Sequence, residues 1–228
     1  MVIDKKFKGL VKEDYRYVFN GNIETTESLE IDLDMGLFVT GYIKAGGSIK
    51  AGGSIEAGEF IEAGGSIKAG GFIKAGGSIE AGEFIEAGGS IKAGGFIKAG
   101  GFIEAGGSIK AGGFIKAGEF IKAGWSIKAG EFIEAGGFIK AGGYYGIVAG
   151  LSITCKDTLS FGLKVFAGIC AWREVTDEEK TITCGKLENG AVGYGILKET
   201  GLEPEDDDRT EEAMKLLREK GYKIIKEK

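Results

Sequence analysis

Apolar and polar residues alternate with a period of six along the middle of the chain, from residue 41 to residue 142. Isoleucine fills the third position of all seventeen hexads, from Ile43 to Ile139, and alanine follows it by two positions. A period of six does not keep to one face of an α-helix, and each glycine inside a helix costs about 1 kcal/mol. Residues two apart do share one face of a strand. The pattern therefore predicts a short strand in each hexad, with Ile and Ala on the inner side.

Each hexad has glycine at its sixth position and usually at its first, as in residues 47–52 (GSIKAG). Paired glycines predict a corner that tolerates positive φ. Burying one Ile contributes roughly 1.5–3 kcal/mol, whereas ordering a residue costs about 1–2 kcal/mol, so one hexad is not stable alone. The coils must therefore stack edge to edge. The expected fold is all-β, a single-stranded parallel β-solenoid.

The second hexad position indicates how many hexads make one coil. From Ser90 onward this position reads Ser, Phe, Phe three times, an 18-residue period that favours a three-sided coil. Between Ser54 and Phe84 it alternates Ser and Phe, a 12-residue period that suits a flattened two-sided coil. Residues 53–76 and 77–100 are identical, however, so the shorter period can record a tandem duplication. We favour three sides and keep two sides as the alternative.

The duplication also bears on function. In a three-sided coil, four inserted hexads rotate every later unit by one face. A precise pocket on one face would be disrupted by that rotation, so interchangeable hexads favour a scaffold or a repetitive surface. In a two-sided coil the insertion adds two whole coils, and this argument does not apply.

Three regions are expected: an N-terminal capping segment (1–28), the solenoid (29–172) and a C-terminal region (173–228). Residues 29–40 keep the hexad register, and alternation continues downstream to residue 171. In the C-terminal region, Asn189-Gly190 predicts a small β-hairpin. A capping box at Asp208 predicts a helix that ends at Gly221, followed by a strand over 222–226, which together form a small α/β cap.

Charge and composition limit which partners and which cellular compartment are expected. The net charge is −5 with acids and bases interleaved, so no nucleic-acid partner is expected. No apolar stretch of about 18 residues could span a membrane, and the first residues lack a signal-peptide core. We interpret the three cysteines as reduced thiols of a cytoplasmic protein.

No enzymatic activity is expected, and no catalytic residue is assigned. The chain contains no histidine, which excludes the commonest general base and any Ser-His-Asp arrangement. No cofactor or metal is predicted, because the glycines follow the hexad period rather than a nucleotide-binding motif. The glutamates at the first hexad position are interpreted as solvated corners that pair with lysines, not as calcium ligands. These are Glu59, Glu83, Glu119 and Glu131.

Phenylalanines at the second hexad position are the candidate association surface. Each phenylalanine directly precedes an inward-facing isoleucine in the strand, so its side chain is expected to point outward. Stacked rings would form large apolar ridges. Either these ridges mediate self-association or docking of a protein partner, or they only stabilise the sheet. Polysaccharide binding is a weaker alternative, because Trp and Tyr, which usually contact sugars, occur outward only at Tyr42, Trp125 and Tyr144. The phenylalanines are Phe60, Phe72, Phe84, Phe96, Phe102, Phe114, Phe120, Phe132 and Phe138.

The short I-x-A-G-G-x strands and the less regular flanking coils resemble bactofilin-type polymer-forming proteins over roughly residues 29–171. The resemblance implies a three-sided β-helix that polymerises end to end without nucleotide. This chain departs from that family in its near-perfect repeats and in its C-terminal region. We therefore expect a non-enzymatic structural scaffold or self-assembling β-solenoid. The alternative is a binding module that presents an extended surface to a protein or a polysaccharide.

Overall fold

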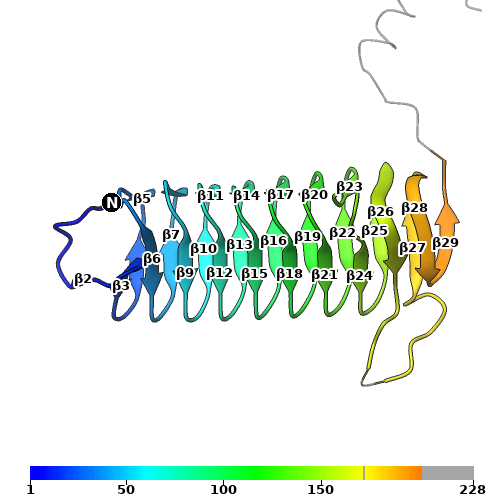
Figure 1. Cartoon of the computed structure of the whole chain (residues 1–228), viewed down its shortest axis with the longest axis horizontal. Helices are drawn as coiled ribbons and strands as arrows, with labels where there is room; N and C mark the ends of the chain where they lie inside the picture. The colour runs from blue at the N-terminus through cyan, green and yellow to red at the C-terminus, as the bar shows by residue number, and fades with distance from the viewer. Residues whose placement is uncertain (172, 202–228) are drawn as a thin grey trace, which may run out of the picture.

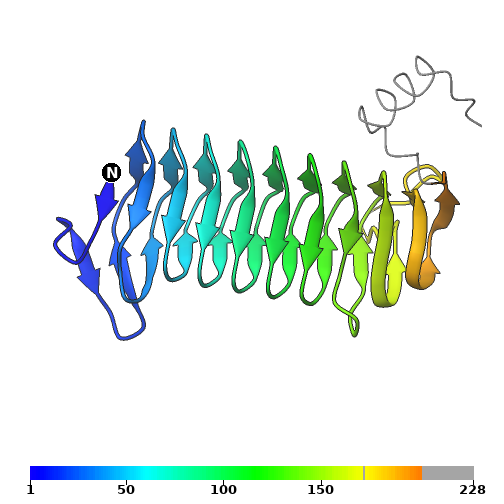
Figure 2. The ribbon, with the colours of Figure 1, turned by 90° about the horizontal axis from the view of Figure 1, so that it is seen from above.

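The computed structural model describes residues 1–171 and 173–201. The chain winds into successive coils that stack along one axis (Figures 1 and 2). Strands within the hexad tract pair in parallel at a spacing of 18 residues, as Ile61 with Ile79 and Ile67 with Ile85. One coil therefore holds three hexads. The predicted three-sided solenoid is confirmed, and the two-sided alternative is wrong.

The three hexads of a coil form three faces. Face 1 contains β5 (Leu29–Ile31), β8 (Ile49–Ala51), β11 (Ile67–Ala69), β14 (Ile85–Ala87), β17 (Ile103–Ala105), β20 (Ile121–Ala123) and β23 (Ile139–Lys140). Face 2 contains β3 (Arg16–Phe19), β6 (Gly36–Val39), β9 (Ile55–Ala57), β12 (Ile73–Ala75), β15 (Ile91–Ala93), β18 (Ile109–Ala111), β21 (Ile127–Ala129) and β24 (Ile147–Ala149). Face 3 contains β4 (Ile23–Thr25), β7 (Ile43–Ala45), β10 (Ile61–Ala63), β13 (Ile79–Ala81), β16 (Ile97–Ala99), β19 (Ile115–Ala117), β22 (Ile133–Ala135), β25 (Ile153–Cys155), β27 (Thr181–Cys184) and β29 (Ile196–Glu199).

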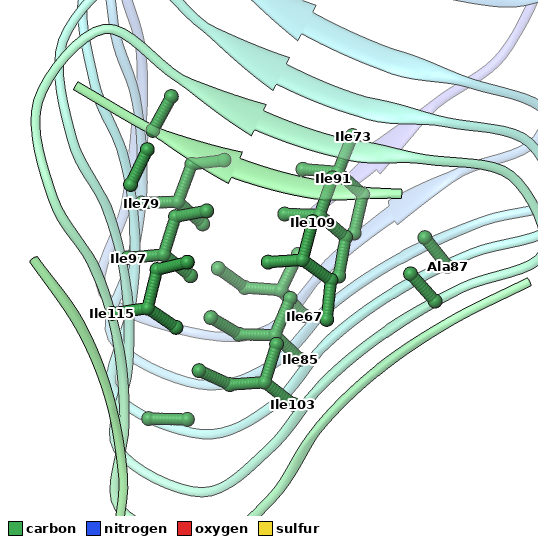
Figure 3. Packing of buried hydrophobic residues seen from close by; sticks show 14 of the residues in the cluster. Ile67, Ile73, Ile79, Ile85, Ala87, Ile91, Ile97, Ile103, Ile109 and Ile115 are labelled. Carbon is green, nitrogen blue, oxygen red and sulfur yellow. The ribbon is translucent and has the colours of Figure 1, made fainter. Parts of the chain in front are cut away.

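Isoleucine columns from the three faces meet inside the coils and form one continuous core (Figure 3). Every hexad isoleucine from Ile43 to Ile139 is fully buried, and the alanines from Ala45 to Ala141 are almost as inaccessible. The β-branched isoleucine suits a strand, and the small alanine leaves room near each corner. Each coil therefore buries its apolar side chains against its own three faces and against the neighbouring coils.

Hydrogen bonds between coils continue around the corners. On the strands, Ile67 N donates to Phe84 O at 2.9 Å. At the corners, Gly64 N donates to Ala45 O at 2.9 Å, and Gly65 N donates to Gly47 O at 3.1 Å. Because these corner amides are paired as well, the coil can turn without leaving buried polar groups unsatisfied.

The corner glycines do not adopt the positive φ that we expected. Among the described residues, positive φ occurs only at glycines outside residues 41–142. Glycine is needed at the sixth hexad position because the coils approach closely there: a Cβ on Gly112 would overlap the carbonyl oxygen of Gly94. The room at the first position varies: a Cβ on Gly113 would lie 3.6 Å from the nearest backbone atom, whereas a Cβ on Gly107 would overlap Ser90 Oγ.

The parallel ladder extends beyond residues 29–172 at both ends. At the N-terminal end β3 pairs in parallel with β6, and β4 with β7. Two further strands lie at this end: β1 (Val2–Ile3) pairs in parallel with β5, and β2 (Leu10–Lys12) pairs antiparallel with β3. At the other end β26 (Thr158–Phe166) runs along faces 1 and 2, and β28 (Lys186–Tyr194) follows it.

The hairpin predicted around Asn189-Gly190 is wrong. β27 pairs in parallel with β25 and with β29, and β28 pairs in parallel with β26, so these strands form a further coil. Gly190 does have a positive φ of 91°, but it lies within β28, where a Cβ would overlap the ring of Phe161. Packing against the preceding coil therefore overrides the local turn signal. The predicted helix and the final strand lie outside the described residues.

Candidate association and binding surfaces

The nine candidate phenylalanines all point outward, but they lie on different faces. Face 1 carries a column of four, Phe84, Phe102, Phe120 and Phe138. Face 3 carries Phe60, which stacks on Tyr42, and the column Phe96, Phe114 and Phe132. Phe72 stands alone on face 2. The structure thus brings seven of the nine into two long columns.

Rings within a column stack almost parallel. Their centroids are 4.7–4.9 Å apart, with interplanar angles of 1–6°. This distance matches the spacing of about 4.8 Å between neighbouring strands. Eight of the nine rings are half-buried, whereas the unstacked Phe72 is 42% exposed. Stacking therefore covers the flat surfaces of the rings and leaves their edges at the surface.

Serine columns occupy the same hexad position where phenylalanine is missing. The Ser90 Oγ accepts a hydrogen bond from the Ser108 amide at 3.1 Å, and the Ser108 Oγ accepts one from the Ser126 amide at 3.4 Å. Serine thus pairs an amide of the next coil, whereas phenylalanine stacks a ring on the next coil. The second position contributes to coil stacking in two chemically different ways.

The duplication shifts these columns by one face. The Ser48 and Ser66 units lie on face 1, but the matching Ser90, Ser108 and Ser126 units lie on face 2. The inserted length of 24 residues is one coil of three hexads plus one further hexad. Every later unit therefore moves to the next face, as expected for a three-sided coil.

One consequence is a gap in the aromatic column of face 3. Ser78 stands between Phe60 and Phe96, and a groove of about 560 Å³ opens between the two rings. Ser78 Oγ accepts a hydrogen bond from the Phe96 amide at 3.2 Å. The groove lies where one ring of the column is missing, because Phe60 stacks only on Tyr42 and Phe96 only on Phe114.

Charges at the fourth hexad position are paired across coils on faces 1 and 3. On face 3, Nζ–Oε distances are 2.8 Å for Lys44–Glu62, 2.7 Å for Lys98–Glu80 and 2.9 Å for Lys116–Glu134. On face 1, Lys68–Glu86 and Lys122–Glu104 pair in the same way, at 2.8 and 2.7 Å. Opposite charges on neighbouring strands are mildly stabilising.

Face 2 differs, because four lysines follow one another in a single column. Lys74 is paired with Lys92 in the strand register, Lys92 with Lys110 and Lys110 with Lys128. Lys74 contacts Glu56, but the next three form no ion pair with any described residue. We call Lys92, Lys110 and Lys128, with Ser90, Ser108 and Ser126 beside them, the lysine stripe. Our sequence analysis missed it, although comparing every eighteenth residue would have revealed it.

Exposed aromatic side chains lie at both ends of the lysine stripe. Trp125 directly precedes Ser126, is 54% exposed and stacks with Tyr145, whose ring centroid lies 6.0 Å away. At the other end, a groove of about 600 Å³ is lined by Phe72, Ser90 and Lys92. The stripe therefore runs between two apolar platforms.

The corner glutamates do not pair with lysines in the part of the chain that the structure describes. Glu83 instead accepts a hydrogen bond from the Ser66 hydroxyl at 2.6 Å. Our prediction of lysine pairing at these corners is therefore wrong. Within residues 1–171 and 173–201, no group of three acidic or cysteine side chains is arranged to hold a metal ion.

Two of the three cysteines lie in the core of neighbouring coils on face 3. Cys155 and Cys184 are buried and Cys170 is half-buried, and all three are free thiols. Burial raises the pKa of Cys155 to about 12. Both core thiols thus stay protonated and pack as small apolar side chains.

The fold and the outer columns define the molecule as a three-sided β-solenoid. No protein-family model, no curated protein and no solved structure matches the chain. No helix in the described residues is long and apolar enough to cross a membrane.

Proposed function

We propose that this protein is a non-enzymatic structural scaffold that self-associates through its aromatic columns. The observation that carries the proposal is the column of Phe84, Phe102, Phe120 and Phe138 on face 1, together with the shorter column on face 3. Four aligned ring edges form a straight apolar ridge along a rigid sheet. A second copy with the same ridge can cover it over its whole length, because both ridges have the same repeat.

The repeated core supports the scaffold part of the proposal. Each hexad contributes the same Ile and Ala to the interior, so coils can be added without redesign of their neighbours. Such a solenoid holds its surface groups at a fixed spacing over many coils. As in our sequence analysis, we place it in the cytoplasm, in line with the three free thiols.

Sedimentation velocity over a range of concentrations, combined with electron microscopy, tests the proposal. The chain is expected to form dimers or larger assemblies as its concentration rises. The double variant F102S/F120S should lose this association and still fold, because serine naturally occupies the same hexad position. The control F72S removes an exposed ring outside the columns and should associate like the native chain. A native chain that stays monomeric at every concentration would rule the proposal out.

A second candidate function is a binding module that presents an extended surface. The lysine stripe favours it, because three lysines in a row have no acidic partner among the described residues. A partner captured by face 2 without any self-association of the chain would favour this candidate over the scaffold.

A further inference from the structure

We propose that the lysine stripe of face 2 binds a linear polysaccharide whose sugars carry carboxylates, with the polymer aligned along the solenoid axis. This inference does not depend on self-association, because the stripe and the phenylalanine columns lie on different faces. It names the ligand class for the second candidate function. Three observations carry it: the unpaired charges, their spacing and the aromatic platforms.

The charges of the stripe favour an anionic partner. Lys92, Lys110 and Lys128 are exposed and stand directly above one another, and like charges opposite each other on neighbouring strands are destabilising. On face 3, the same hexad position pairs each lysine with a glutamate. The whole chain carries a net charge of −5, so a polyanion is repelled on average and needs a local cluster of unpaired positive charge such as this stripe.

The spacing selects among polyanions. Coils repeat about every 4.8 Å, so the stripe offers one ammonium group and one hydroxyl per coil. An extended acidic peptide places carboxylates on one side about every 6.7 Å, which does not match. Phosphates along one strand of a DNA duplex rise by about 3.4 Å per nucleotide along the helix axis while the strand winds around it, so they do not form a straight row beside the stripe. A linear polyuronate carries one carboxylate per sugar unit, and a sugar unit is about as long as one coil is high. The match is therefore one of linear charge density, because successive carboxylates of a 1,4-linked chain point to different sides.

The neighbouring side chains also suit sugars. Ser90 Oγ and Ser108 Oγ each accept one amide hydrogen bond, and the hydroxyls of Ser108 and Ser126 bond to each other at 3.1 Å. A hydroxyl has one donor and two acceptor sites, so each serine can still hydrogen-bond a sugar. Trp125 and Tyr145 at one end and Phe72 at the other present flat apolar surfaces on which a sugar ring can stack. Proteins that bind single-stranded nucleic acid instead stack an aromatic ring on successive bases. The middle of the stripe carries no aromatic column.

Binding of polygalacturonate to the full chain, measured by calorimetry at two salt concentrations, tests the proposal. The probes for comparison are fully methyl-esterified polygalacturonate, which has the same backbone without charge, and single-stranded polydeoxythymidylate. The native chain should bind only the free polygalacturonate, and affinity should fall as salt rises. The variant K92Q/K110Q/K128Q should bind free polygalacturonate at least about tenfold more weakly than the native chain. The variant W125A should also bind it more weakly, but by a smaller factor.

The matched control is K44Q/K98Q/K116Q, which removes three lysines from the same hexad position of face 3. This control changes the net charge by the same amount as K92Q/K110Q/K128Q. Its affinity for polygalacturonate should stay within about twofold of that of the native chain. Thermal unfolding confirms that both triple variants fold. Equal losses in the two variants would overturn the proposal, because net charge alone would then explain binding. No binding of polygalacturonate, or equal binding of the methyl ester or of polydeoxythymidylate, would also overturn it.

Discussion

Face 2 and face 3 are built from the same hexads, yet they differ on the outside. Both bury fully inaccessible isoleucines, such as Ile109 and Ile115, and both use the same backbone ladder. Outside, face 3 carries stacked phenylalanines and paired charges, whereas face 2 carries serines and unpaired lysines. The inward residues therefore determine the fold, and the outward residues can change without affecting it. The following predictions test this separation.

The largest effect is expected in the core, and it should be equal on the two faces. Ile109→Ala on face 2 and Ile115→Ala on face 3 should each destabilise the surrounding coils by about 2–5 kcal/mol, because each leaves a cavity between neighbouring isoleucines. Hydrogen exchange of the amides in the adjacent coils measures the cost locally. A cost that differs between the faces by more than about 1 kcal/mol would show that their interiors are not equivalent.

A slightly smaller effect is expected at the corner where face 2 meets face 3. Gly112→Ala should cost about 1–3 kcal/mol, since the new methyl group overlaps the carbonyl oxygen of Gly94. Gly113→Ala, one residue later, should change stability by no more than about 0.5 kcal/mol, because its Cβ has room. Chemical denaturation of the two variants measures the difference. Equal costs would argue that the corner needs glycine for its backbone angles instead.

Phenylalanine at a serine position should have opposite effects on the two faces. Ser78→Phe on face 3 also loses a hydrogen bond, the one from the Phe96 amide, but it fills the gap between Phe60 and Phe96 and should gain about 0.5–1.5 kcal/mol for each of two new ring pairs. Ser108→Phe on face 2 gains no ring pair and loses the hydrogen bond to the Ser126 amide. Thermal unfolding should therefore show S78F as the more stable variant. The reverse order would mean that ring stacking does not stabilise the columns.

The smallest effects are expected from charge. Lys98→Gln breaks the ion pair with Glu80 and should cost about 0.2–1 kcal/mol. Lys110→Gln relieves repulsion from Lys92 and Lys128 and should leave stability unchanged or slightly higher. Added salt should reduce both effects, because it screens the charges. Unfolding at low and high salt measures this, and a loss of stability in K110Q at low salt would contradict the assignment of face 2 as a repulsive column.

Periodicity alone predicts most of this fold. The constant Ile and Ala define the interior, and the Ser, Phe, Phe order indicates three hexads per coil, because only an 18-residue spacing puts like residues in one column. The requirement for glycine at Gly112 could not be predicted, because it depends on the distance to the neighbouring coil. The hairpin predicted at Asn189-Gly190 is wrong for a related reason. Gly190 packs on Phe161, a contact between residues far apart in the sequence, and a local turn motif gives no information about such a contact.

The candidate surface was predicted only in part. The outward direction of the phenylalanines follows from their parity, but their division over two faces depends on how the duplication shifts the later units. The lysine stripe required the coil length to be known first. Until that length is fixed, Lys92 and Lys110 are simply two of many surface lysines.

The central claim is that hexads are interchangeable inside while their outer side chains form columns at a spacing of 18 residues. Deletion of residues 77–100 removes one copy of the duplication and should stack Lys68 directly on Lys110, which in the native chain lie on different faces. A disulfide between cysteines at these two positions, detected by electrophoresis after mild oxidation, tests this directly, because stacked strand residues meet the distance requirement of a disulfide. Our account predicts that K68C/K110C forms the bridge in the deletion variant and not in the native-length chain. The control K110C/K128C should bridge in both. A bridge between positions 68 and 110 at native length, or its absence in a deletion variant where the control bridges, would contradict the account.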